Sequence, residues 1–115
     1  VQRFGRLIDQ DIEKAQVLTS LIEADSALAL MFPTNINIVC FRYDPGGLSP
    51  EALRAVNTEI MLCLQEQGTA VLSDTTVRGE HCLRVAVNNH RTQAQDLELL
   101  VSEVLRLGHQ LRQAA

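Results

Sequence analysis

Residues 36–43 (INIVCFRY) constrain the fold more than any other part of this sequence. The segment is rich in β-branched and aromatic residues, as is typical of a strand, and both of its faces are apolar. One face carries Ile36, Ile38 and Cys40, and the other carries Val39, Phe41 and Tyr43. Strands of this kind are covered on both sides. The sheet that contains this segment therefore needs cover on both faces.

Helical and strand periodicities alternate along the rest of the chain. Pro50 is suited to the first turn of a helix, Gly68 to a helix stop, and Thr92 with Gln95 to a capping box. In chain order we expect a helix at 4–23, strands at 27–32 and 36–43, a turn at Pro33-Thr34-Asn35, a helix from Pro50 to Gly68, strands at 69–77 and 80–87 joined by Arg78-Gly79, and a last helix after Thr92 that frays near Gly108.

This order, α-β-β-α-β-β-α, predicts an α+β fold with a small, mostly antiparallel four-stranded sheet and helices on one face. Each of the three helices has one apolar stripe to bury, so together they cover one side of the sheet. We expect the second side to be covered by protein outside this chain. Residues 1–115 are predicted to form a single small domain.

Composition narrows the choice of partners. The 10 basic and 14 acidic residues give a net charge of −4, which disfavours binding to nucleic acid. No apolar run approaches the roughly 20 residues of a membrane span.

The three cysteines, Cys40, Cys63 and Cys82, lack Cys-x-x-Cys spacing, as expected for reduced thiols in the cytoplasm and not for a metal site. Because the chain begins at Val1 and not at Met, we expect it to be a piece of a longer protein.

Arg84 is the strongest candidate for a functional residue. Alternation along 81–87 directs Leu83 and Val85 toward the helices and Arg84 toward the other face. An arginine within an apolar strand is costly unless it is paired or faces a polar cavity. A guanidinium binds a planar carboxylate through two parallel hydrogen bonds. Two interpretations stay open: an ion pair within this protein, or the binding of an anionic ligand.

Other charged residues are weaker candidates. Arg91 follows the same strand in a loop and either contacts a ligand or is solvated. Arg42 is either a second interface charge or an ordinary edge arginine. Lys14, the only lysine, falls on the polar face of the first helix, which makes a Schiff-base role there improbable. The sequence contains no glycine-rich phosphate loop and no arrangement typical of a Ser-His-Asp nucleophile.

Three segments carry a resemblance to a known family: 37–43 (NIVCFRY), 72–79 (LSDTTVRG) and 83–92 (LRVAVNNHRT). In order and spacing they resemble the C-terminal segment of the group II pyridoxal-phosphate-dependent decarboxylases, and the resemblance extends from Gly5 to Gly108. It implies a carboxy-lyase of fold type I that works as a homodimer on an amino acid. A large domain outside this chain would carry pyridoxal 5'-phosphate and its Schiff-base lysine.

The resemblance also implies roles for individual residues. The small C-terminal domain of such enzymes closes over the active site and supplies an arginine for the substrate's carboxylate, and the match at Leu83-Arg84 makes this residue Arg84. Arg91 matches a less constant position and is a weaker substrate-binding candidate. The fragment alone would be inactive. The competing hypothesis is a stand-alone ferredoxin-like module that serves regulation, small-molecule binding or dimerisation through the same uncovered sheet face.

Overall fold

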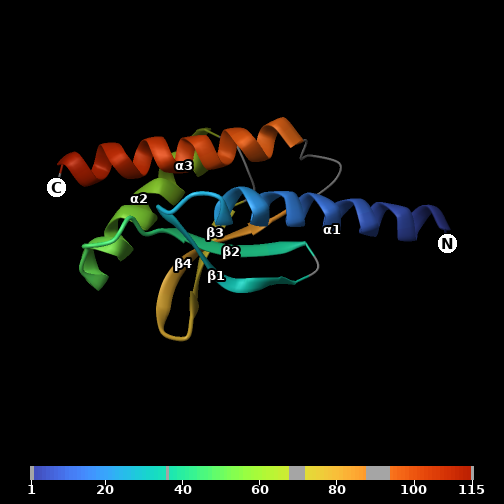
Figure 1. Cartoon of the computed structure of the whole chain (residues 1–115), viewed down its shortest axis with the longest axis horizontal. Helices are drawn as coiled ribbons and strands as arrows, with labels where there is room; N and C mark the ends of the chain where they lie inside the picture. Colours follow the sequence, from blue (N-terminus) through green and yellow to red (C-terminus); the bar gives the residue numbers. More distant parts are fainter. Residues whose placement is uncertain (1, 36, 68–71, 88–93, 115) are drawn as a thin grey trace.

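Three helices lie on one side of a four-stranded sheet in the computed structural model of this chain (Figure 1). The structure describes residues 2–35, 37–67, 72–87 and 94–114. Its elements are α1 (Gln2–Glu23), β1 (Leu28–Asn35), β2 (Ile38–Tyr43), α2 (Pro50–Gln67), β3 (Leu72–Val77), β4 (Glu80–Ala86) and α3 (Ala94–Ala114). The predicted α+β class and the order of its elements are confirmed. In the described part of the chain, no helix is long and apolar enough to cross a membrane.

The sheet has the strand order β1-β2-β4-β3, and all neighbouring strands are antiparallel. The two central strands are therefore β2 and β4, and they pair with Phe41 opposite Leu83. A two-residue turn joins β3 to β4, with φ of 53° at Arg78 and 80° at Gly79. Two successive positive φ values are typical of the tight hairpin turn that the sequence predicted.

Alternation along the central strands separates two faces. Val39, Phe41, Leu83 and Val85 point toward the helices and are buried. The opposite face, here called the open face, carries side chains from β2, β4 and β3: Ile38, Cys40, Arg42, Cys82, Arg84, Ala86, Ser73, Thr75 and Val77. Among the described elements, no helix covers the open face (Figure 1).

The first edge strand corrects one prediction. Pro33-Thr34-Asn35 was expected to form a turn, but β1 extends through it to Asn35, with an irregular register between Phe32 and Asn35. Proline lacks an N–H and is tolerated at the edge of a sheet, where β1 lies. The predicted strand start at Ile36 and the predicted cap at Thr92 lie outside the described residues.

A buried asparagine attaches the end of β2 to α2. The Asn57 side chain is fully buried, and its Oδ1 accepts a 2.8 Å hydrogen bond from the Tyr43 backbone N–H. Its Nδ2 donates to the carbonyl oxygens of Tyr43 (3.0 Å) and Leu53 (2.8 Å). One side-chain amide thus bonds both buried backbone groups of Tyr43 and a part-buried carbonyl of α2.

The fraying predicted near Gly108 is wrong, because α3 continues to Ala114. Gly108 is buried where the aromatic ring of Tyr43 packs on the helix, and a Cβ at this position would lie 2.6 Å from the Cδ1 and Cε1 atoms of that ring. The hydroxyl of Tyr43 lies 3.1 Å from Nδ1 of the next residue, His109. The glycine is needed for close approach of the ring and does not end the helix.

Replacing Gly108 by alanine is expected to destabilise the chain. The extra methyl group overlaps the Tyr43 ring, and overpacking of this kind costs about 1–3 kcal/mol, more than the roughly 1 kcal/mol that alanine gains over glycine in a helix. Urea unfolding measures the difference. The exposed Ser102→Ala in the same helix is the control and should be neutral or slightly stabilising. A Gly108→Ala variant as stable as the control would contradict the close packing.

Candidate functional site

Arg84 lies at the centre of the open face, on the central strand β4. Its neighbours Leu83 and Val85 are buried under the helices, whereas the Arg84 side chain is half-buried on the other side of the sheet. In the pairing register, Cys40 of β2 and Ser73 of β3 flank it. The structure therefore places Arg84 on the face that strand alternation predicted.

Arg84 lines a concavity of about 390 Å³ on the open face. The other lining residues are Phe32, Ile38, Cys40, Thr75, Thr76 and Val77. Most of this wall is apolar, and Phe32 is 45% exposed. A guanidinium on an apolar wall is suited to an anionic group that is partly withdrawn from water.

The two arginines of the open face differ in their partners. Arg42 lies 3.0 Å from an oxygen of Asp44 and 3.6 Å from an oxygen of Glu80. No described residue forms an ion pair or a hydrogen bond with the Arg84 guanidinium. Of the two interpretations of Arg84, the structure thus disfavours the internal ion pair.

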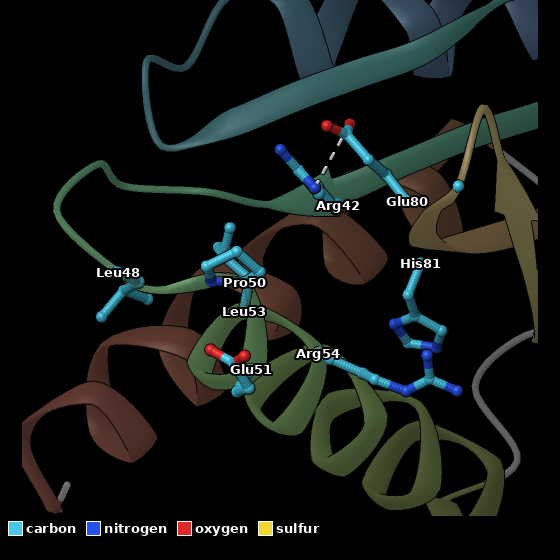
Figure 2. A pocket seen from close by; sticks show the side chains of 9 residues that line it. Arg42, Leu48, Pro50, Glu51, Leu53, Arg54, Glu80 and His81 are labelled. Atoms are coloured by element: carbon cyan, nitrogen blue, oxygen red, sulfur yellow. Dashed lines mark ion pairs between the residues drawn. The ribbon is translucent and has the colours of Figure 1, made fainter.

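A second concavity, of about 330 Å³, lies between the start of α2 and the turn that joins β3 to β4 (Figure 2). Arg42 and Glu80 face each other at one end of it, and Arg54 lies near His81 at the other end (Figure 2). The His81 side chain is 6% exposed, and its Nε2 lies 3.0 Å from an Asp74 oxygen. Arg42 thus forms ion pairs within the chain on the central strand β2, so its interpretation as an edge arginine is wrong, and a role at an interface stays a prediction.

Two thiols lie beside Arg84 on the open face. Cys40 is half-buried directly across from it, and Cys82 is fully buried. Burial raises the pKa of the Cys82 thiol to about 11, and the adjacent Cys40 thiol adds to the rise. Cys82 therefore stays protonated near neutral pH and is a poor nucleophile.

The structure does not place the second predicted substrate-binding residue. Arg91, the second substrate-binding candidate, lies outside the described residues. Among the described residues, no group of three or more His, Cys, Asp or Glu side chains could hold a metal ion. Sequence reasoning did not assign a binding role to Thr75. A two-residue turn at Arg78-Gly79 sets the register of the hairpin, in which Thr75 pairs with Cys82 and Ser73 pairs with Arg84. Because paired residues share a face of the sheet, this register indicates that Thr75 lies on the open face.

Comparisons with known proteins agree with this fold. No family model matches the chain. The chain is 25% identical over 108 residues to the aromatic-L-amino-acid decarboxylase of Catharanthus roseus, covering 94% of this chain and 21% of the relative. It is 29% identical over 98 residues to tryptophan decarboxylase 2 of Oryza sativa subsp. japonica. This match covers 85% of this chain and 20% of the relative. The homologues of this chain are group II amino acid decarboxylases.

Solved decarboxylases share the fold. The crystal structure of Oryza sativa TDC with PLP superposes with a TM-score of 0.86 at 24% identity, covering 96% of this chain and 24% of that chain. A second match is the glutamate decarboxylase domain of diaminobutyrate-pyruvate transaminase and L-2,4-diaminobutyrate decarboxylase from Vibrio parahaemolyticus. It superposes with a TM-score of 0.79 at 23% identity, covering 92% of this chain and 22% of that chain. The chain spans about a fifth of the length of its curated decarboxylase relatives.

Pyridoxal phosphate is the cofactor of the parent decarboxylase family. The described residues of this chain do not fit it. The only lysine, Lys14, is half-buried on α1, which lies on the opposite side of the sheet from Arg84, and it already interacts with another residue. The concavity beside Arg84 therefore has no lysine among its lining residues that could hold the cofactor.

Proposed function

We propose that residues 1–115 form the small C-terminal domain of a pyridoxal-phosphate-dependent amino acid decarboxylase. In this proposal the open face closes the active site, and Arg84 orients the carboxylate of the substrate. Support comes from the homologues, which are decarboxylases about five times longer than the aligned segment. A chain of this relative size leaves room for a large domain of the same enzyme.

The observation that carries the proposal is the guanidinium of Arg84, which lacks a partner among the described residues and lines an apolar concavity. The planar fork of a guanidinium matches both oxygens of a carboxylate. Because β4 is a central strand with its other face in the core, the backbone of Arg84 is held rigidly. Rigid placement is what orientation of a scissile bond requires.

The chain's own contribution would be binding, orientation and exclusion of water. Cover over the open face removes water from around Arg84, which strengthens its attraction for a carboxylate. The electron-withdrawing chemistry of carbon dioxide loss would be supplied by the cofactor, held by the large domain. Arg91 is proposed as a second, weaker substrate contact after β4. We further propose a cytoplasmic homodimer with its active sites at the subunit boundary.

The full-length enzyme that contains this chain provides the test. With pyridoxal phosphate it should release carbon dioxide from an aromatic, acidic or diamino acid in a screen of these classes. The 115-residue chain alone should retain no stoichiometric cofactor after gel filtration. Failure of the full-length enzyme to release carbon dioxide from any of them would overturn the proposal. Such a failure would favour the alternative of a regulatory, small-molecule-binding or dimerisation module.

A further inference from the structure

We infer that Thr75 is a second binding group for the substrate's carboxylate, and this inference rests on the proposed role of Arg84. In the β3–β4 hairpin, Ser73 pairs with Arg84 and Thr75 pairs with Cys82. Thr75 therefore lies on the open face, diagonal to Arg84 on the neighbouring strand. Both residues line the same concavity.

The Thr75 hydroxyl is suited to donate to an incoming anion. The residue is half-buried, and among the described residues its hydroxyl has no hydrogen-bond partner. A carboxylate offers about four acceptor positions, of which a bidentate guanidinium takes two. A neighbouring hydroxyl can occupy a third position. The branched Cβ of threonine restricts its side-chain rotation, so the donor is held in few orientations.

Neighbouring residues are less suited to this role. Phe32, Ile38 and Val77 also line the concavity, but their side chains carry no hydrogen-bonding group. Thr76 also lines it, but Thr76 pairs with His81 on the alternate set of β3 side chains and is exposed. Ser73 is directly opposite Arg84 but does not line the concavity. Among the residues that the structure describes, Thr75 is thus the hydroxyl residue that both shares a face with Arg84 and lines the same concavity.

The test uses the full-length enzyme and the variants Thr75→Val and Thr75→Ser. Valine keeps the shape of threonine and favours strands, so Thr75→Val should fold. Loss of a hydrogen bond to a charged group should raise KM for the amino acid by about 10- to 100-fold. Thr75→Ser should retain a KM within about threefold of the parent, because serine lacks the methyl group of threonine but keeps the hydroxyl that makes the hydrogen bond. Inhibition by the amine product, which lacks the carboxylate, should be unchanged in both variants.

Ser73→Ala and Thr76→Val are the matched controls and should leave KM near that of the parent. An unchanged KM in Thr75→Val, while Arg84→Met raises it, would overturn the role of Thr75 and leave the proposed function standing. Equal weakening of amino acid and amine binding in Thr75→Val would also overturn it, because a packing defect does not distinguish the two ligands. If Arg84→Met has no effect, the proposed function fails, and the inference with it.

Discussion

If the proposed function holds, replacing Arg84 by methionine lowers kcat/KM of the full-length enzyme, with an expected loss of transition-state stabilisation on the order of 2–5 kcal/mol. Methionine retains much of the side-chain length but provides no positive charge and no hydrogen-bond donor. The substrate's carboxylate would then lie on the apolar wall of Phe32, Ile38 and Val77 without a counter-charge. Initial rates of amine formation over a range of amino acid concentrations measure the effect.

Two further variants separate the loss of carboxylate binding from general damage. Arg84→Lys keeps the charge but not the bidentate geometry, so its rate should lie between those of the parent and Arg84→Met. Arg42→Met removes the other arginine of the open face, whose charge is already held by Asp44 and Glu80. Its KM should stay close to that of the parent. Near-normal turnover by Arg84→Met would refute the role of Arg84.

Replacing Asn57 by leucine is expected to cost about 3–5 kcal/mol of unfolding free energy. The substitution leaves the N–H and carbonyl of Tyr43 without their buried partner and removes a third hydrogen bond to Leu53. Each buried polar group left unsatisfied costs roughly 1–3 kcal/mol. Urea unfolding of the chain, followed by circular dichroism, measures the loss.

The exposed Glu59→Ala on the same helix is the control for Asn57→Leu and should change stability by less than about 0.5 kcal/mol. Asn57→Asp should be at least as destabilising as Asn57→Leu, because its carboxylate would be buried with one oxygen facing the carbonyl oxygens of Tyr43 and Leu53. An Asn57→Leu variant as stable as the control would mean that α2 does not hold the end of β2 through this amide.

Local patterns in the sequence predicted the position of Arg84 well. The two-residue periodicity of 81–87 is unambiguous, since Leu83 and Val85 alternate with Cys82 and Arg84. The tight Arg78-Gly79 turn then fixes the register of β3 against β4. Both signals depend on residues that are close together along the chain.

Features that depend on distant contacts were missed. Asn57 reads as an ordinary polar residue of a helix and becomes buried only because α2 crosses the end of β2. Gly108 reads as a weak point of a helix and is required only because the Tyr43 ring packs there. The ion pairs of Arg42, and the lack of one at Arg84 among the described residues, depend likewise on where acidic side chains come to lie in three dimensions.

The most direct test of the proposed pairing between Arg84 and the carboxylate is a thermodynamic cycle in the full-length enzyme. Dissociation constants would be measured for a non-reacting carboxylate analogue of the substrate and for the corresponding amine, with both the parent and Arg84→Met. We predict that the variant weakens binding of the carboxylate ligand by about 2 kcal/mol more than binding of the amine. Equal weakening of the two ligands, or none, would contradict a contact between this guanidinium and the carboxylate.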